Sequence, residues 1–389
     1  MKVLIAIDSF KCCLSSEEAG DTVRKGILKA CPDTEVVVKT VSDGGEGMSD
    51  TLIRALGCDV VHTAVSDPLH RKTEVSYGFS AEKKLAVMEM ASAAGITLLD
   101  ENEKDPLETT TYGVGEMIAD ALHRGAREFI IGIGGSATND GGTGMLQALG
   151  FEFYDSEGDI VSPSGRGLRD IAGISDRNAL PEIKESCFRV ACDVNNPLCG
   201  EKGCSAVFGP QKGLRGDDIP VMDMWLRKYA VLTKEKYPHA DMNYPGAGAA
   251  GGLGFAFRSY LNAELVPGID MIIRETGIDR EIETADIIIT GEGCLDEQSV
   301  MGKVPGGVAR FAKEYDKTVI AFAGMIKDTV SFSEYGIDAC FPVVRQPVSL
   351  NEAKIPENAK RNLEITAEQV FRLIGKNLQV RSIRKKNDA

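Results

Sequence analysis

Two loops near the N-terminus combine acidic groups with a cation or with glycines, a pattern that suits anion or metal binding. Asp8-Ser9-Phe10-Lys11 follows an apolar run and precedes a helical pattern, so we expect it near a helix N-terminus, which attracts anions. Asp43-Gly44-Gly45-Glu46-Gly47 holds two carboxylates in a glycine-rich loop. Mg²⁺ usually takes only one or two protein carboxylates. An ordinary βα loop and a turn with solvated acids are the alternative interpretations.

Two further segments place polar groups directly after apolar strands. The first, GGSATNDGGTG, is typical of a phosphate-binding cradle with added metal or substrate ligands. The second begins with Asp193, which could act as a general base for a hydroxyl or as a metal ligand, and continues with Asn195. Later in this segment, residues 209–213 (GPQKG) predict a turn that presents a lysine. Hinge glycines and a helix-capping or turn-forming aspartate are the structural alternatives.

The last two segments are rich in glycine. Gly251 and Gly252 precede a helix, where the backbone could touch a ligand or, equally well, pack closely on another helix. GEGCLDEQSVMGKVPGG includes Asp296 and Lys303, and a lysine in such a loop can neutralise a transferring phosphate. It is not a Walker A loop, because Glu297 stands at the position of the first glycine and Val304 replaces Ser/Thr.

The elements that would position these segments alternate between strand and helix. Apolar runs predict strands over 3–7, 36–41, 129–133, 188–192, 286–290, 318–323 and 338–343. Ser15-x-x-Glu18 predicts a capping box that opens a helix, and a later helix should end at Gly57. Residues 60–90 alternate like antiparallel strands. Residues 291–307 read as a long loop, followed by helices over 308–315 and 365–377.

This order of strands and helices predicts an α/β protein of two domains. Both chain ends, residues 1–62 and 284–389, would form a Rossmann-like parallel-sheet domain, and residues 63–283 a large inserted mixed α/β domain. Ligands of parallel sheets bind beyond the carboxyl ends of the strands. We therefore expect the active site in the cleft between the two domains.

Composition narrows the functional classes. With 389 residues, 43% hydrophobic and 26% charged, the chain is typical of a globular protein. A net charge of −14 argues against nucleic acid or anionic lipid as a partner. No apolar run approaches the roughly 20 residues of a membrane span. The ten cysteines form no CxxC pair, which predicts reduced thiols in a cytoplasmic protein.

Taken together, the six segments resemble the type-1 glycerate kinase family along nearly the whole chain. The motifs occur in the family's order and spacing: DSFKCCLSS, SDGGEG, DPLHR, GIGGSATNDGGTG, CDVNNPL with FGPQKG, PGAGAAGGLG and TGEGCLDEQSVMGKVP. Cys12-Cys13 departs from it, since the family typically has Gly-Ser or similar small residues there. The resemblance implies Mg²⁺- and ATP-dependent phosphorylation of D-glycerate in organic acid catabolism. The usual product would be 2-phosphoglycerate rather than 3-phosphoglycerate.

We assign roles to individual residues as hypotheses, and several could be exchanged. Asp193 would accept the hydroxyl proton, while Lys11 and Lys303 offset charge on the phosphates. Glycerate would be bound by Asp8, Ser9, Asn195 and an arginine fork, either Arg71 or Arg166. The nucleotide phosphates would contact Gly134, Gly135, Ser136, Thr138, Asn139, Asp140, Gly251 and Gly252. Mg²⁺ would be held by Asp43, Glu46 and Asp296.

Two other classes of function each match part of the sequence or its composition less well. Gly132-x-Gly134-x-x-Ala137 with Glu152 matches the dinucleotide fingerprint of an NAD-dependent dehydrogenase, but this explains only one of the six segments. A small-molecule sensor should carry a DNA-reading element or a basic patch, and neither is apparent. The sequence leaves a homodimer open and does not indicate the role of Cys12 and Cys13.

Overall fold

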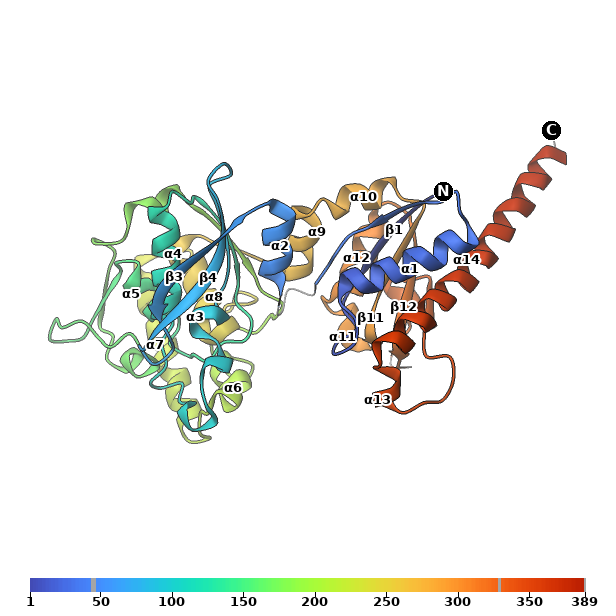
Figure 1. The fold of residues 1–389 in the computed structure, drawn as a ribbon. Coiled ribbons are helices and arrows are strands. Elements are labelled where there is room, and N and C mark those ends of the chain that lie inside the picture. The colour runs from blue at the N-terminus through green and yellow to red at the C-terminus, as the bar shows by residue number, and fades with distance from the viewer. Residues whose placement is uncertain (43–46, 328–329, 388–389) are drawn as a thin grey trace. The chain divides into compact units, whose positions relative to one another are not determined.

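The chain divides into two α/β units, each built around its own sheet (Figure 1). The computed structural model describes residues 1–42, 47–327 and 330–387, with side chains up to residue 376. Unit 1 comprises Met1–Asp43 and Ile269–Ala389, and unit 2 comprises Gly44–Gly268. The predicted α/β class, with a parallel sheet from both chain ends and a mixed α/β part between them, is confirmed.

Unit 1 holds a five-stranded sheet in which all neighbouring strands are parallel. Its order is β13 (Ala339–Pro342), β12 (Thr318–Ile326), β11 (Ile287–Leu295), β1 (Lys2–Ile7) and β2 (Glu35–Val38). Counted from the N-terminus this is the doubly wound order 2-1-3-4-5, whose topological switch point lies between its first and third strands, here β1 and β11. Ligands of such sheets bind outside the carboxyl ends of the strands at that point.

Helices cover both faces of the unit 1 sheet. α1 (Ser16–Ala30) and α14 (Pro356–Asn387) lie side by side on one face, where they pack on Val3, Ile5 and Ile7 (Figure 1). α10 (Ile278–Thr284) and α12 (Val304–Glu314) pack on strands of the same sheet from the other side. The remaining helices of this part are α9 (Gly268–Glu275), α11 (Glu297–Val300) and α13 (Leu350–Ala353).

Several local predictions for unit 1 are confirmed and others need correction. The capping box is present, with Ser15 Oγ accepting from the Glu18 amide at 3.2 Å and the Glu18 carboxylate accepting from the Ser15 amide at 3.0 Å. The expected long loop over 291–307 is wrong in its first part. β11 runs on to Leu295 because residues 291–295 pair with 322–326 of β12. α12 likewise starts at Val304, since a proline is well tolerated in the first turn of a helix.

Unit 2 holds a six-stranded mixed sheet and a two-stranded ribbon. The sheet order is β10 (Glu264–Val266), β9 (Cys187–Ala191), β6 (Glu128–Gly132), β5 (Leu85–Glu89), β4 (Lys72–Ser80) and β3 (Asp59–Ser66). The first four are mutually parallel, while β4 pairs antiparallel with β5 and β3, as the alternation over 60–90 predicts. The carboxyl ends of β5, β6 and β9 therefore meet at one edge. The ribbon pairs β7 (Glu152–Tyr154) with β8 (Gly173–Ser175).

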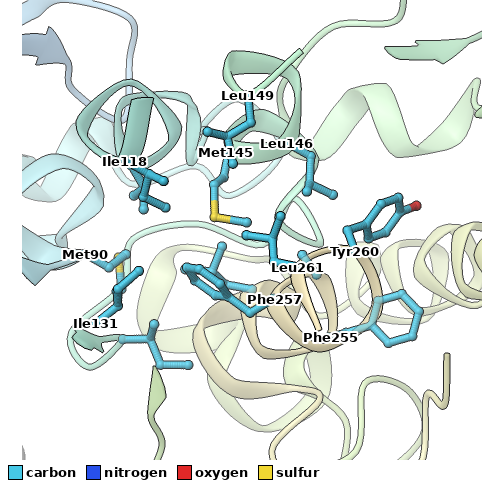
Figure 2. Close-up of a cluster of buried hydrophobic side chains, with 14 of the residues drawn as sticks. Met90, Ile118, Ile131, Met145, Leu146, Leu149, Phe255, Phe257, Tyr260 and Leu261 are labelled. Carbon is cyan, nitrogen blue, oxygen red and sulfur yellow. The ribbon is translucent and has the colours of Figure 1, made fainter. Parts of the chain in front are cut away.

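The core of unit 2 is formed where its helices pack on one another and on β6. Figure 2 shows Ile118 of α4 (Tyr112–His123), Ile131 of β6, and Met145 and Leu146 of α5 (Thr143–Ala148) in one cluster with Phe257 of α8 (Leu253–Leu261). All of these side chains are buried. The other helices are α2 (Met48–Leu56), α3 (Ala91–Ala94), α6 (Cys204–Phe208) and α7 (Asp218–Lys236). Among the described residues, no helix combines the length and hydrophobicity needed to cross a membrane.

The observed bounds of the units differ from those expected at residues 62 and 284. α2 packs on β4, β5 and β6, which places residues 47–62 in unit 2. α10 packs on α12 and β1, which places it in unit 1. Each of these amphipathic helices joins the sheet that buries its apolar face. The division into functional domains stays a prediction.

Candidate active site

A cavity of about 610 Å³ opens in unit 1 beyond the end of β1, at the switch point of the sheet. β1 ends at Ile7, opposite Gly291, whereas β11 and β12 stay paired as far as Leu295 and Ile326. The projecting parts of these two strands form one wall of the cavity. Four residues predicted from the sequence line it, namely Ser9, Lys11, Asp296 and Lys303.

The loop after β1 is fixed against β11 by its backbone. The amide of Asp8 donates to the carbonyl of Gly291 at 2.9 Å, and Asp8 Oδ1 accepts from the Ser9 amide at 2.7 Å. The Asp8 carboxylate is buried, so it orders this loop. A Cβ on Gly293 would lie 3.6 Å from the Lys11 amide nitrogen, so the loop after β1 packs against the projecting part of β11. Glu292, which has no role among the sequence-based assignments, is also buried and lines the cavity.

Asp296 and Lys303 both occupy helix starts at the cavity. Asp296 caps α11 by accepting from the Gln298 amide at 3.1 Å, and its Oδ2 pairs with Lys327 Nζ at 3.0 Å. The hydrogen bond from Lys327 holds the pKa of Asp296 below its usual range. Lys303 is the N-cap residue of α12. Its assignment to phosphate, and that of Asp296 to a metal, stay predictions; the Gln298 amide and Lys327 already bond to the two oxygens of Asp296.

The far side of the cavity is apolar, and the sequence reasoning missed it. We call this side the apolar wall; it consists of Met325, Val343, Val344, Val348, Leu350 and Ala353. Most of these residues belong to VVRQPVSL, residues 343–350, which follow β13, the edge strand of the parallel sheet. Apolar residues directly after a parallel strand lie at the ligand-binding edge, and this was the signal available in the sequence.

In unit 2, the predicted phosphate cradle is a buried, internally bonded loop. Ser136 is nearly buried, and Thr138, Asn139 and Asp140 are fully buried. Lys212, also buried, donates from its ammonium to Ser136 Oγ at 2.6 Å and to the Thr138 carbonyl at 2.7 Å. Burial lowers the pKa of the Lys212 ammonium from 10.5 to about 8. The lysine of the predicted turn is therefore an internal cross-link, a role that its sequence context did not indicate.

Asp140 organises the same loop. Its Oδ2 accepts from the amide and the hydroxyl of Thr111 at 2.8 and 2.7 Å and from the Gly144 amide at 3.3 Å. Its Oδ1 accepts from the Gly142 amide at 3.0 Å. Burial raises the pKa of this carboxyl, although the hydrogen bonds that it accepts oppose the shift. These bonds tie the loop to the start of α4 and to α5.

Gly251 and Gly252 pack against that loop. A Cβ on Gly251 would lie 2.1 Å from the Thr138 carbonyl oxygen, and one on Gly252 would lie 2.8 Å from Gly141 Cα. Both glycines have positive φ, at 66° and 94°. Close packing of backbone on backbone thus accounts for these two glycines. Their predicted contact with nucleotide, and that of Ser136 to Asp140, stay predictions.

Other predicted residues lie exposed at the carboxyl edge of the unit 2 sheet. Gly134 and Gly135 follow β6, and Asp193 and Asn195 follow β9, so all four project beyond neighbouring parallel strands. Asp193 Oδ1 accepts from the Gly268 amide at 2.8 Å. The start of α2 reaches this edge too, because Glu89 at the end of β5 accepts from the amide and the hydroxyl of Ser49, each at 3.1 Å.

The two candidate arginines are held in ion pairs within unit 2. Arg71 donates from Nε to Asp67 and from Nη1 to Glu103, each at 2.6 Å. Arg166 donates from Nε to Glu108 at 2.6 Å. Each guanidinium has nitrogens beyond those used in these bonds, so either could still meet a carboxylate. Their binding of glycerate stays a prediction.

The metal site predicted from the sequence falls largely outside the described residues. Asp43 and Glu46 are not among them, and only Asp296 is. Over 1–42, 47–327 and 330–387, no group of three or more His, Cys, Asp or Glu side chains could hold a metal ion. All ten cysteines lie in the described parts and are thiols. Cys12 has a left-handed backbone (φ 60°), a conformation that glycine adopts without strain.

Comparison with known proteins identifies the family of the chain. Residues 3–375 match the glycerate kinase family. The chain is 44% identical over 355 residues to glycerate 2-kinase of Escherichia coli K12, covering 91% of this chain and 93% of that protein. It is 41% identical over 371 residues to glycerate kinase of Bacillus subtilis 168, covering 95% and 97%. A crystal structure of putative glycerate kinase 2 from Salmonella typhimurium LT2 superposes with a TM-score of 0.86 at 38% identity, covering 97% and 99%. The chain therefore belongs to the glycerate kinase family and is an enzyme that phosphorylates glycerate.

Proposed function

We propose that this glycerate kinase transfers the γ-phosphoryl group of ATP to D-glycerate and forms 2-phosphoglycerate. The observation that carries the proposal is the match to the family over residues 3–375. The curated relative from E. coli is named for phosphorylation at position 2, which favours that hydroxyl here. An organic acid that enters this reaction leaves as a phosphate ester, which fits a role in glycerate catabolism.

The residues of each unit suit phosphoryl transfer, in which positioning and charge neutralisation do most of the work. In unit 1, Lys11 and Lys303 line one cavity and would offset charge on the phosphates. In unit 2, Asp193 would accept the proton of the attacking hydroxyl, and Asn195 with Arg71 or Arg166 would bind the acid. Asp8 would act through the loop that carries Ser9 and Lys11, since its carboxylate is buried and bonded within that loop.

Magnesium would supply positive charge that neutralises the charge developing on the phosphates. Oxygen ligands suit this ion, and Asp296 with Asp43 and Glu46 stays the proposed set. Of these, Asp296 already faces the cavity, where Lys327 satisfies one of its oxygens. Among the described residues, one carboxylate of the proposed set could therefore bind Mg²⁺ directly. Mg²⁺ at nucleotide sites usually takes one or two protein carboxylates.

A nicotinamide-dependent dehydrogenase has little support. After β6, the backbone forms the buried loop that Lys212 and Asp140 hold together, and α5 begins only at Thr143. The dinucleotide fingerprint instead requires a tight turn that opens directly into a helix. Small molecules are the proposed partners, in a cytoplasmic enzyme that could form a homodimer; no nucleic acid or membrane partner is proposed.

One coupled assay tests the proposal. Purified enzyme with Mg²⁺, ATP and D-glycerate should release ADP, and the same mixture without glycerate or with L-glycerate should release far less. Enzymes specific for 2- or 3-phosphoglycerate then identify the product. ADP release that does not depend on glycerate would contradict the proposed reaction, and a product consumed only as 3-phosphoglycerate would contradict the proposed position.

A further inference from the structure

We propose that the nucleotide binds within unit 1, its purine base against the apolar wall and its phosphates at Lys11 and Lys303. This inference rests on the proposed use of ATP. It differs from the expectation that residues 134–140 and 251–252 hold the nucleotide, and the two placements can be separated by experiment.

The order of the strands places polar residues at one end of the cavity and apolar residues at the other. The loop after β1 contributes Ser9 and Lys11, and β11 contributes Glu292. β12 contributes Met325, and the segments that follow β13 contribute the rest of the apolar wall. Because the sheet runs β1, β11, β12, β13, the cavity is polar at the switch point and apolar toward the sheet edge. A ligand that fills it must have one anionic end and one broad, apolar end.

The apolar wall is more exposed than apolar side chains usually are. Leu350 is 69% exposed, Met325 52% and Val344 36%, and all three face the same cavity. A contiguous exposed apolar patch marks a binding surface. The flat face of a purine would bury these side chains, whereas a glycerate carboxylate or hydroxyl would gain nothing from them.

The polar end suits a polyphosphate. Lys303 precedes the first residue of α12, an 11-residue helix whose start has no side-chain cap. The N-terminus of such a helix attracts anions through its backbone N–H groups and its dipole. Lys11 lies on the loop packed against Gly293 of β11 and lines the same cavity. Two cations and a helix N-terminus therefore converge where phosphates would lie.

The dimensions also favour a nucleotide over glycerate alone. Three strand spacings separate β1 from β13, which is about 14 Å at the usual separation of strands. Glycerate has two C–C bonds of about 1.5 Å each and spans roughly 5 Å with its oxygens. The cavity of about 610 Å³ lies within the usual range of small-molecule sites. Glycerate would leave most of it empty, whereas base, ribose and phosphates would occupy it from end to end.

Substitutions in the apolar wall test the base position. Leu350→Asp places a charge where the base would pack and should raise the KM for ATP about tenfold or more, because contact with one leucine is worth about that factor. The KM for glycerate should change less than about twofold. Leu373→Asp is the matched control, since Leu373 is 65% exposed in the same unit and does not line the cavity. Both leucines are exposed, so both variants should fold, and circular dichroism melting checks this.

Photolabelling of the full-length enzyme with 8-azido-ATP and Mg²⁺ tests the site without relying on turnover. Label in peptides covering 343–353, competed by ATP but not by glycerate, supports the proposal. Label in 134–140 or 246–254, or an unchanged KM for ATP in Leu350→Asp, overturns it. If ADP release depends on glycerate but the label lies elsewhere, the proposed reaction stands and only this placement fails. If the label lies in 343–353 and no ADP forms, the placement stands and the proposed reaction fails.

Discussion

Replacing Lys212 by methionine should change how the stability of unit 2 depends on pH. A pKa that falls from 10.5 to about 8 on folding corresponds to roughly 3 kcal/mol of cost for burying the ammonium at neutral pH. Below pH 8 both folded and unfolded chains carry the proton, so the cost is present in full. Between pH 8 and 10.5 the unfolded chain binds more protons, and the wild type becomes more stable as pH rises. Methionine cannot titrate and lacks this gain.

The variant also loses two hydrogen bonds, and this loss opposes the stability that it gains at neutral pH by removing a buried charge. Ser136 Oγ and the Thr138 carbonyl would each lose a donor, at about 1–3 kcal/mol apiece if left unsatisfied. Removing the buried charge offsets part of this loss at pH 7. The lost hydrogen bonds do not depend on pH, whereas the charge effect does. From pH 7 to 10, the wild type should therefore gain about 2 to 3 kcal/mol relative to Lys212→Met.

The single tryptophan makes this measurable for unit 2 alone. Trp225 lies on α7 and packs against the core of unit 2, so its fluorescence during urea unfolding reports on that unit. The two proteins share every other titrating group, and their difference isolates Lys212. Lys184→Met, an exposed lysine of the same unit, shows what loss of a surface lysine does to the signal. A difference between wild type and Lys212→Met that stays constant from pH 7 to 10, or a Lys184→Met curve with the same slope, would refute the reasoning.

Three further substitutions test other parts of unit 2. Gly251→Ala should destabilise the unit by at least about 2 kcal/mol, because φ is 66° and the new Cβ would lie 2.1 Å from the Thr138 carbonyl oxygen. Gly216→Ala is the control, since a Cβ there would meet open space. Equal urea midpoints for the two variants would contradict the close packing at Gly251. Asp140→Asn should cost at least about 2 kcal/mol, since an amide NH₂ would face N–H donors that the carboxylate now satisfies; an unchanged midpoint would show that these bonds contribute little. Asp193→Ala should lower kcat about a hundredfold in steady-state kinetics while circular dichroism stays unchanged, and near-normal turnover would remove Asp193 from the role of base.

Local features of the fold could be predicted because their causes are local. Ser15 and Glu18 form the capping box that their spacing predicts, and Gly57 ends α2 with a left-handed backbone. The apolar run over 3–7 forms the buried β1, since a parallel strand covered on both faces needs no alternation. Where an element depended on pairing with a distant strand, prediction failed: β11 continues past Thr290 only because β12 lies beside it.

The sequence by itself determined the α/β class, the strand-end positions of the polar loops and, through its ordered motifs, the family. The tertiary structure decided which of those polar groups face a cavity and which lie inside. Lys11 and Lys212 look alike as lysines in loops near glycines or strand ends, yet one lines a cavity and the other is buried. The reason is physical. Burial depends on what packs over a loop from distant segments, as residues 251–252 cover the loop at Thr138. Spacing along the chain does not encode that contact.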